Sequence, residues 1–279
     1  MALTDSAPRP TQSEKADTFR ALHQQAFIIA NPWDAGSARV LAGMGFAALA
    51  TSSGGFAGTL GRKDGRVTRA EALAHASAVV DAVDIPVSAD LENGFGDEPD
   101  HAAETVRLAA RAGLVGCSIE DATGDAETPL YGIEAATDRV TASVEAVRSV
   151  GIAFTLTART ECFLRGRPNL EDVIARLQAF EAAGADVLMA PGLPDLAAVK
   201  AVCAAVSKPV NFMVGIPGKS FSRKELIDVG VTRISLATSL YRAAITGLIE
   251  AAEEVRDKGT FGYVDSSVPH PTLAGYMVE

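Results

Sequence analysis

The 279-residue sequence lacks the features that place a chain in a membrane, on nucleic acid or outside the cell. No apolar run is long enough to cross a bilayer, and the opening MALTDSAPRPTQSEKAD has neither the basic start nor the apolar core of a secretory signal. Basic residues are scarce, 25 Lys and Arg against 35 Asp and Glu, and the net charge of −10 argues against nucleic acid and anionic membranes as partners. The three cysteines, Cys117, Cys162 and Cys203, have no metal-binding spacing, and so sparse a set fits a reducing compartment. We therefore expect a soluble globular protein of the cytoplasm.

The sequence also lacks a G-x-G-x-x-G motif after its first apolar segment, where a dinucleotide-binding open sheet would carry one. A different pattern recurs: a helix end, a glycine and a short apolar run, as in LAGMGFAALATS, AARAGLVGCSIED, FEAAGADVLMAP and IDVGVTRISLAT. A glycine at this position commonly ends a helix in a left-handed conformation. Together with the helical periodicity between the runs, the pattern predicts eight strands, near 27–31, 47–52, 86–91, 116–121, 154–160, 186–190, 209–214 and 233–238.

Eight apolar strands alternating with helices predict an α/β protein with a (β/α)8 TIM barrel, a fold that typically takes ~250 residues. No linker-like stretch interrupts the chain, so residues 1–279 are expected to form a single domain. A doubly wound open sheet is the alternative, although it usually has fewer strands. Residues 1–12 are predicted to be a loose tail before a helix that a Thr11-x-x-Glu14 capping box begins. Residues 259–279 are predicted to be an arm that packs on the barrel or on a neighbouring chain.

Acidic residues occupy the predicted strand ends, where a barrel carries its working groups. In SADLENGFGDEPD, Asp90 and Glu92 share one face of an extended segment, and Glu120 ends the next strand. Three carboxylates without His or Cys are typical ligands of Mg²⁺ or Mn²⁺, held together with several waters. The alternative is a structural ion network in which Arg159 and a lysine neutralise the acids.

The segment TSSGG follows the second predicted strand and offers groups for binding an anion. Ser53 supplies a hydroxyl, and the amides of Gly54 and Gly55 are not shielded by a Cβ atom. Asp64 lies in the same loop and either reaches the barrel mouth or serves only as a turn residue.

Two further strand ends carry candidate substrate ligands. Arg159 is suited to holding a substrate carboxylate through two parallel hydrogen bonds, or else it pairs with Glu161 or Glu120. Asn211 either donates or accepts a hydrogen bond at the mouth or fixes a loop.

These segments resemble the isocitrate lyase/phosphoenolpyruvate mutase superfamily. The resemblance is carried by NPWDAGSARVLAGMGF, TSSGG with the downstream Asp64, ADLENGFG, SIED and TARTECFLRG, and it runs over roughly residues 25–245. It implies a (β/α)8 barrel that binds Mg²⁺ and exchanges its last barrel helix between subunits of a dimer or tetramer. It also implies that a C–C or C–P bond beside a 2-oxo or 2-hydroxy acid is made or broken through a Mg²⁺-held pyruvate enolate.

The resemblance also assigns roles by position. Arg159 and Glu120 are the implied catalytic residues. The implied metal ligand is Asp90, the carboxylates around the metal's waters are Asp64, Glu92 and Glu120, and the implied substrate-binding residues are Ser53, Gly54, Gly55 and Arg159. Asn211 is predicted to bind substrate from its place at a strand end alone. The physical argument agrees, because a cation between Asp90 and Glu92 would relieve the repulsion of two carboxylates on one face.

The sequence departs from the superfamily in the region DATGDAETPLYGIEAATD. The Lys-x-Cys-Gly-His loop of the isocitrate and methylisocitrate lyases is missing there, as are the Lys and Asn of the phosphonate mutases. Tyr131, Asp125 or Glu127 could serve as acid or base, and nothing singles one out. We therefore expect a Mg²⁺-dependent lyase that cleaves a C–C bond of a small 2-oxo or 2-hydroxy dicarboxylate by decarboxylation or retro-aldol cleavage. The alternatives are a phosphonomutase or phosphonopyruvate hydrolase and a barrel that binds an oxo acid without turnover.

Overall fold

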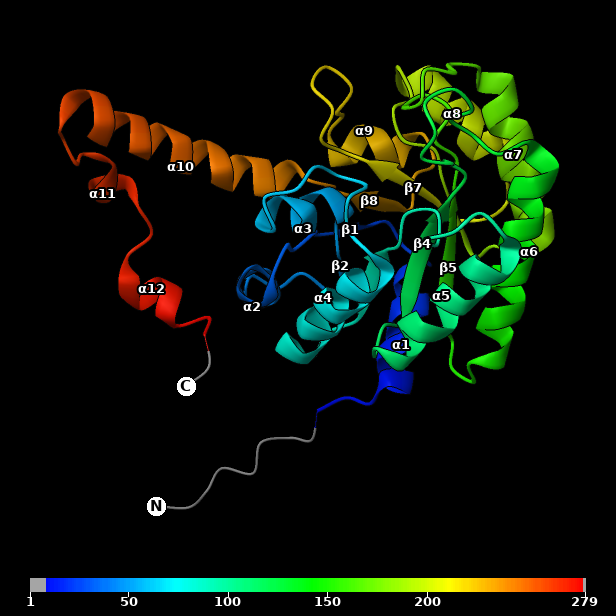
Figure 1. Ribbon diagram of the computed structural model, residues 1–279, viewed down its shortest axis with the longest axis horizontal. Coiled ribbons are helices and arrows are strands. Elements are labelled where there is room, and N and C mark those ends of the chain that lie inside the picture. Colours follow the sequence, from blue (N-terminus) through cyan, green and yellow to red (C-terminus); the bar gives the residue numbers. More distant parts are fainter. Residues whose placement is uncertain (1–8, 278–279) are drawn as a thin grey trace.

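The computed structural model describes residues 9–277, and these form a barrel of eight parallel strands surrounded by helices (Figure 1). The strands are β1 (Phe27–Ile29), β2 (Leu49–Ala50), β3 (Val87–Asp90), β4 (Gly116–Glu120), β5 (Thr155–Arg159), β6 (Val187–Met189), β7 (Val210–Met213) and β8 (Arg233–Ser235). Each lies within its predicted range. Their hydrogen-bonded order is β1-β8-β7-β6-β5-β4-β3-β2, and a parallel bridge between Ala30 and Leu49 joins the two ends. The predicted barrel is confirmed, and the open sheet is excluded.

The seam between β1 and β2 is fastened by Asn31 rather than by a full ladder. Its side-chain amide donates to the Ala50 carbonyl oxygen (2.9 Å), and its Oδ1 accepts from the Leu236 amide (2.7 Å). One buried side chain therefore ties the carboxyl ends of three strands together.

Helices connect the strands and cover their outer faces. They are α1 (Gln12–Leu22), α2 (Ala35–Gly43), α3 (Ser53–Thr59), α4 (Arg69–Ala82), α5 (Pro99–Arg111), α6 (Ile133–Ser149), α7 (Leu170–Ala183), α8 (Leu196–Ala205), α9 (Arg223–Asp228), α10 (Ser239–Lys258), α11 (Tyr263–Ser266) and α12 (His270–Ala274). The glycines of the recurring pattern all have positive φ, as a helix end in the left-handed region requires: Gly45, Gly113, Gly184 and Gly230. The local pattern that predicted the barrel is thus confirmed in the backbone.

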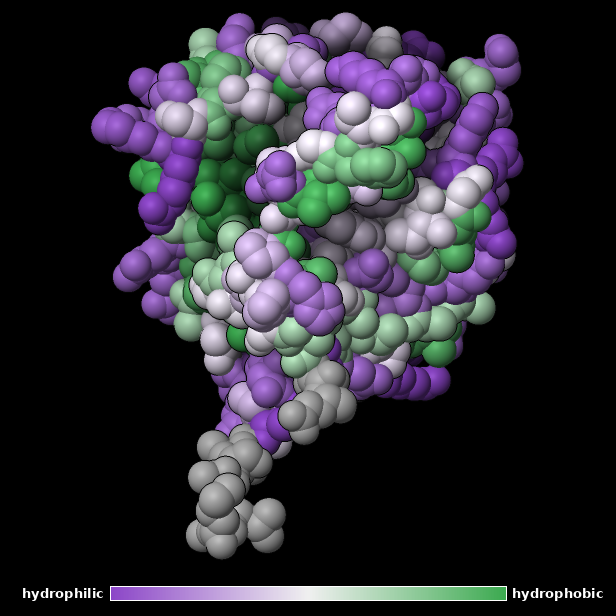
Figure 2. Space-filling model, turned by 90° about the vertical axis from the view of Figure 1, so that its left-hand side faces the viewer, coloured by the Kyte–Doolittle hydropathy of each residue, from purple (hydrophilic) through white to green (hydrophobic). Residues whose placement is uncertain are grey.

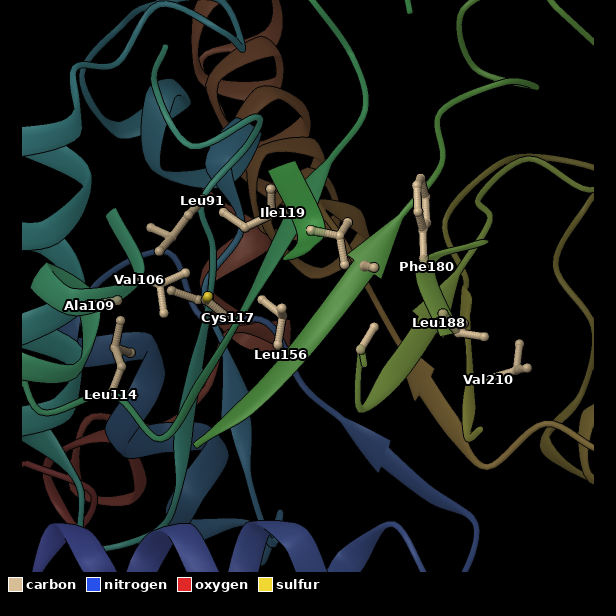
Figure 3. Close-up of a cluster of buried hydrophobic side chains, with 14 of the residues drawn as sticks. Leu91, Val106, Ala109, Leu114, Cys117, Ile119, Leu156, Phe180, Leu188 and Val210 are labelled. Atoms are coloured by element: carbon tan, nitrogen blue, oxygen red, sulfur yellow. The ribbon is translucent and has the colours of Figure 1, made fainter. Parts of the chain in front are cut away.

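The main apolar core lies between the strands and the helices. Leu91, Ile119, Leu156 and Leu188 point outward from the β3–β6 side of the barrel and are packed against helical residues such as Phe180 (Figure 3). Because side chains alternate along a strand, the intervening residues point into the barrel. Beside the apolar Ile29, Met189 and Met213, the interior carries polar side chains at Ser88, Ser118, Thr157, Asn211 and Arg233. Barrel interiors are usually filled with Val, Ile and Leu, so this one leaves room for a ligand.

The chain leaves the barrel after β8 as an extended arm. Helix α10 projects away from the other elements, and α11 and α12 turn back beside it (Figure 1). None of the residues of α10 is buried, and large apolar side chains such as Leu248, Ile249 and Phe261 are at least half exposed. Figure 2, which views the molecule from the side of the arm, shows apolar surface open among polar side chains. The ring of Tyr276 packs against Gly43 of α2, which brings the end of the arm back to the barrel.

The N-terminal segment is only partly as expected. Thr11 begins α1 with the predicted capping box, which is confirmed. Residues 1–8 of the predicted tail lie outside the described residues, whereas Arg9 is held by an ion pair with Asp84 and is not loose. Among residues 9–277, no helix combines the length and the apolar character needed to cross a membrane.

Candidate functional site

Two adjoining cavities open at the carboxyl ends of the strands. The inner cavity, about 180 Å³, extends into the barrel, and the outer one, about 530 Å³, lies among the loops above it. Ser53, Asp64, Arg159 and Leu164 line both cavities, so the two form one site. The strand-end residues predicted from the sequence therefore do converge.

Asp90, at the end of β3, is the central carboxylate of this mouth. It accepts hydrogen bonds from the Ser53 hydroxyl (2.9 Å) and the Ser118 hydroxyl (3.4 Å), and Arg159 Nη1 lies 3.7 Å from its Oδ1. Its backbone amide donates to Thr51 Oγ1 (3.2 Å). These contacts fix the carboxylate while leaving it on the wall of the inner cavity.

The turn after β3 holds Glu92 in an unfavourable backbone conformation. Glu92 has a φ of 48° and Phe95 a φ of 60°, both in the left-handed region that few residues other than glycine adopt. Such strain persists only where the surroundings impose it, and here Asn93 Oδ1 accepts from the Phe95 amide (3.0 Å) while Thr105 donates to the Gly94 carbonyl oxygen (2.8 Å). Burial, aided by the negative charges of Asp90 and Asp64, raises the pKa of Glu92 to about 7.

Buried acids and arginines form a network beside Asp90. Arg159 Nε donates to Glu161 Oε1 (2.6 Å), and its Nη1 lies 3.4 Å from Glu120. Arg165 lies 3.4 Å from Glu120 and 3.5 Å from Glu161. Burial raises the pKa of Glu120 to about 8, although Arg159 opposes this rise. The ion pairs of Arg159 with Glu161 and Glu120, which the sequence offered as the alternative role, are thus present in the structure.

The charges of the mouth do not balance. Apart from Arg233, which lies deeper in the barrel, the two cavities are lined by five carboxylates and three guanidinium groups. The acids are Asp64, Asp90, Glu92, Glu120 and Glu161, and the arginines are Arg66, Arg159 and Arg165. Burial is the main cause of the raised pKa values of Glu92 and Glu120, and neighbouring carboxylates add to both rises. A divalent cation would neutralise two of these negative charges.

The donor set restricts which cation would fit. Within residues 9–277, no three His, Cys, Asp or Glu side chains converge closely enough to hold a metal together. This excludes the closed ligand set of a structural zinc site there. Mg²⁺ takes oxygen ligands, keeps several waters and needs only one or two carboxylates directly. The oxygen donors around Asp90 are therefore compatible with Mg²⁺ held largely through water.

The Ser53-Gly54-Gly55 segment begins helix α3 instead of forming a loop. A Cβ atom on Gly54 would lie 3.1 Å from Asp64 Oδ2, so glycine is what lets Asp64 approach the segment. The Gly55 amide donates to Ser52 Oγ (3.3 Å), and Gly55 does not line either cavity. Of the two predicted glycines, Gly54 lines the inner cavity, whereas the amide of Gly55 is used to cap the helix.

Asn211 lies deeper than the mouth. Its Nδ2 donates to Ser235 Oγ (2.9 Å), and its Oδ1 accepts from Arg233 Nε (2.9 Å). The sequence reasoning did not identify Arg233, which is buried on the wall of the inner cavity. The alternation of β8 was the available signal, because it puts Arg233 on the same inward face as Ser235.

Tyr131 and Asp125, two of the candidates in the 122–135 loop, form hydrogen bonds with residues outside the two cavities. The Tyr131 hydroxyl donates to Asp97 (2.7 Å), and burial raises its pKa to about 12. Asp125 accepts from the Glu127 amide (2.9 Å) and from Thr128 (3.0 Å), which fixes the loop. None of the three candidates, Tyr131, Asp125 and Glu127, lines the inner or outer cavity.

Comparisons with known proteins agree with the resemblance seen in the sequence. A crystal structure from Burkholderia cenocepacia J2315, described only as a lyase/mutase, superposes with a TM-score of 0.93 at 50% identity, covering 95% of this chain and 96% of the other. An oxaloacetate decarboxylase of Marinomonas sp. (strain MWYL1) is 26% identical over 95% of this chain and 94% of its own. A 2-methylisocitrate lyase of Escherichia coli (strain K12) is 28% identical over 77% of this chain and 75% of its own. The sequence model named phosphoenolpyruvate phosphomutase matches residues 19–256. The chain therefore belongs to the phosphoenolpyruvate phosphomutase family, within the isocitrate lyase/phosphoenolpyruvate mutase superfamily of lyases and mutases.

Proposed function

We propose that the protein is a Mg²⁺-dependent lyase that cleaves a C–C bond of a small 2-oxo or 2-hydroxy dicarboxylic acid through a pyruvate-type enolate. The observation that carries the proposal is an acid-rich mouth, centred on Asp90, directly above a small cavity inside the barrel whose lining includes hydroxyl, amide and guanidinium groups. The oxaloacetate decarboxylase among its relatives supports the choice of C–C bond cleavage.

The proposed roles follow from the positions of the side chains. Mg²⁺, or Mn²⁺ in its place, would supply positive charge where negative charge develops on the substrate oxygen. Asp90 would hold the metal, and Asp64, Glu92 and Glu120 would hold its waters. Ser53 and the Gly54 amide would bind the substrate carboxylate. Arg159 would bind the acid beside the metal, kept in place by its bond to Glu161.

Decarboxylation suits a site with few free acids and bases. The Tyr131 hydroxyl and the Asp125 carboxylate are hydrogen-bonded away from the cavities, and release of CO₂ needs no proton donor at the leaving group. Retro-aldol cleavage would need a base, for which a water beside Glu120 is the nearest candidate. The pKa of Glu120, which burial raises to about 8, favours proton exchange near neutral pH.

The experiment is a screen for pyruvate release, coupled to lactate dehydrogenase, over C4 to C6 2-oxo and 2-hydroxy diacids with and without Mg²⁺. We expect one acid to give Mg²⁺-dependent product and Asp90→Asn to lose it. A C–P enzyme, which the name of the matching family favours, would instead act on phosphonopyruvate or phosphoenolpyruvate. No product from any acid, despite tight oxalate binding, would favour a barrel that binds without turnover.

We further propose that the protein is a cytoplasmic homo-oligomer, a dimer or tetramer, that exchanges the arm formed by α10, α11 and α12. The support is the apolar surface of the arm, where Leu248, Ile249 and Phe261 are at least half exposed although Tyr276 contacts the barrel at Gly43. Replacing both Leu248 and Ile249 by Glu should give monomers in size-exclusion chromatography with light scattering. The paired control Glu250→Gln should keep the assembly, and a wild-type monomer would contradict the proposal.

A further inference from the structure

The floor of the inner cavity carries a positive charge that the mechanism above does not use. Arg233, the first residue of β8, is only 6% exposed and lines this cavity. Its neighbours in register are Asn211 on β7 and Phe27 on β1, so it lies well inside the barrel, away from the acidic loops.

Every partner of Arg233 among the described residues is neutral. Its Nε donates to Asn211 Oδ1 (2.9 Å), its Nη2 to Thr157 Oγ1 (2.8 Å), and its Nη1 lies 3.2 Å from His23 Nε2. No carboxylate within residues 9–277 forms an ion pair with it. A guanidinium has five N–H groups, and these three acceptors leave two of them available.

His23 is also uncharged. Its Nδ1 lies 2.8 Å from the Phe19 carbonyl oxygen, which only accepts, so Nδ1 carries the hydrogen and Nε2 accepts from Arg233. Burial and the charge of Arg233 lower the pKa of His23 to about 4. Helix α1 thus supports the arginine from below without neutralising it.

An unpaired buried charge is costly, so its retention calls for a compensating group. Among the described residues, the acids that line the cavity are Asp64 and Asp90, and both lie at its mouth. The rest of the lining combines apolar side chains such as Met213 with the hydroxyl and amide side chains of Ser88, Thr157, Asn211 and Ser235. These are suitable partners for a carboxylate, and the same cavity opens at Asp90 and Arg159.

We infer that Arg233, with Asn211 and Thr157, binds a second acidic group of the substrate at the floor of the inner cavity. The substrate would then be a diacid that enters with one carboxylate inside the barrel and its 2-oxo or 2-hydroxy end at the mouth. This inference rests on the proposed function and names the side chains that bind the second carboxylate of its substrate.

The test compares three ligands by calorimetry in saturating Mg²⁺: oxalate, malate (both enantiomers) and 2-hydroxybutyrate. Malate and 2-hydroxybutyrate differ chiefly in the terminal carboxylate, and oxalate is too short to span mouth and floor. We expect the wild type to bind the preferred malate about 30-fold more tightly than 2-hydroxybutyrate, the range of a charge-assisted hydrogen bond. In Arg233→Met this ratio should fall to near 1, while oxalate affinity changes less than about threefold. Arg107→Met, on the exposed surface of α5, is the matched control.

The outcomes separate the two claims. Oxalate binding by the wild type with no preference for malate would overturn the role of Arg233 and leave the proposed function standing. An equal loss of oxalate and malate in a folded Arg233→Met protein would make the arginine structural, and this too would overturn the inference. Failure of the wild type to bind any of the three would overturn the proposed function and the inference with it.

A second variant guards against misfolding. Asn211→Asp keeps the shape of the side chain but places a carboxylate beside Arg233. We expect this variant to melt at a higher temperature than the wild type and to lose the preference for malate, because the internal acid replaces that of the ligand. A variant that retains the full preference would contradict the inference.

Discussion

The two arginines of the inner cavity have opposite surroundings. Arg159, at the mouth, contacts three carboxylates, whereas Arg233, at the floor, contacts only neutral groups. Burial alone would lower the pKa of both; at Arg159 the acids reverse this and raise its pKa, but at Arg233 the pKa stays lowered, at about 9. The mouth therefore has excess negative charge that suits a cation, and the floor has a positive charge that suits an anion. This division matches a metal-assisted reaction on an acid that spans both ends.

The largest expected difference is in stability. Arg159→Met would leave buried Glu120 and Glu161 without a main partner, and we expect it to lower the free energy of unfolding by about 3–5 kcal/mol. Arg233→Met removes an unpaired charge but leaves the buried acceptors on Asn211, Thr157 and His23 without their donor, so we expect a smaller loss of about 1–2 kcal/mol. Urea unfolding of both variants without ligand measures this, and equal losses would remove the distinction between mouth and floor.

A smaller effect, on ligand affinity, is expected from a substitution at Gly54, which lies against Asp64. Gly54→Ala would put a Cβ 3.1 Å from Asp64 Oδ2 and 2.9 Å from Thr238 Cγ2, which displaces the carboxylate from the mouth. We expect Mg²⁺-dependent oxalate affinity to fall about 10- to 100-fold, as when groups around a metal are disturbed. Gly132→Ala, where an added Cβ meets nothing within 4 Å, is the control. Unchanged affinity in Gly54→Ala would remove Asp64 from the metal site.

The smallest effect concerns the pH dependence of the mouth. The pKa of Glu92 is about 7 in the folded protein against an ordinary 4.5, so the folded state holds this proton more tightly than the unfolded chain. The contribution of the protonated Glu92 carboxyl group to the stability of the fold is therefore full below about pH 4.5 and is lost as the pH rises through 7. Without Mg²⁺, Glu92→Gln should raise the melting temperature by about 3 °C at pH 8 and not at pH 4.5.

Glu134→Gln, an exposed change of the same kind on α6, should shift the melting temperature at neither pH. An identical shift of Glu92→Gln at both pH values would show that the mouth does not strain this carboxylate.

The barrel could be predicted because its signals are local. Each glycine that ends a helix and each apolar run that follows it lie within a dozen residues, and the strands begin and end where these runs do. The acids of the mouth could be predicted for a similar reason, since closure of a barrel brings all strand ends together. For Asp90, Glu92 and Glu120, the position at the end of an apolar run was enough to predict that they lie at the mouth.

The groups that were missed depend on distant partners. An arginine at the start of a strand looks the same in sequence whether it faces solvent or, like Arg233, the inside of the barrel. Its neutral surroundings come from β5, β7 and α1, which only the folded chain brings together. The role of Gly55 was missed for a local reason, because Ser52 is the residue that caps α3.

The central claim is that the acids at the mouth hold a cation on which a small oxo acid binds. Calorimetric titration of oxalate, with Mg²⁺ and with chelator in its place, tests this most directly. We predict binding only in Mg²⁺, with Asp90→Asn weakening it at least about 100-fold. Absence of binding in both conditions, or equal binding without Mg²⁺ and in Asp90→Asn, would contradict the claim and make the acids of the mouth a structural network.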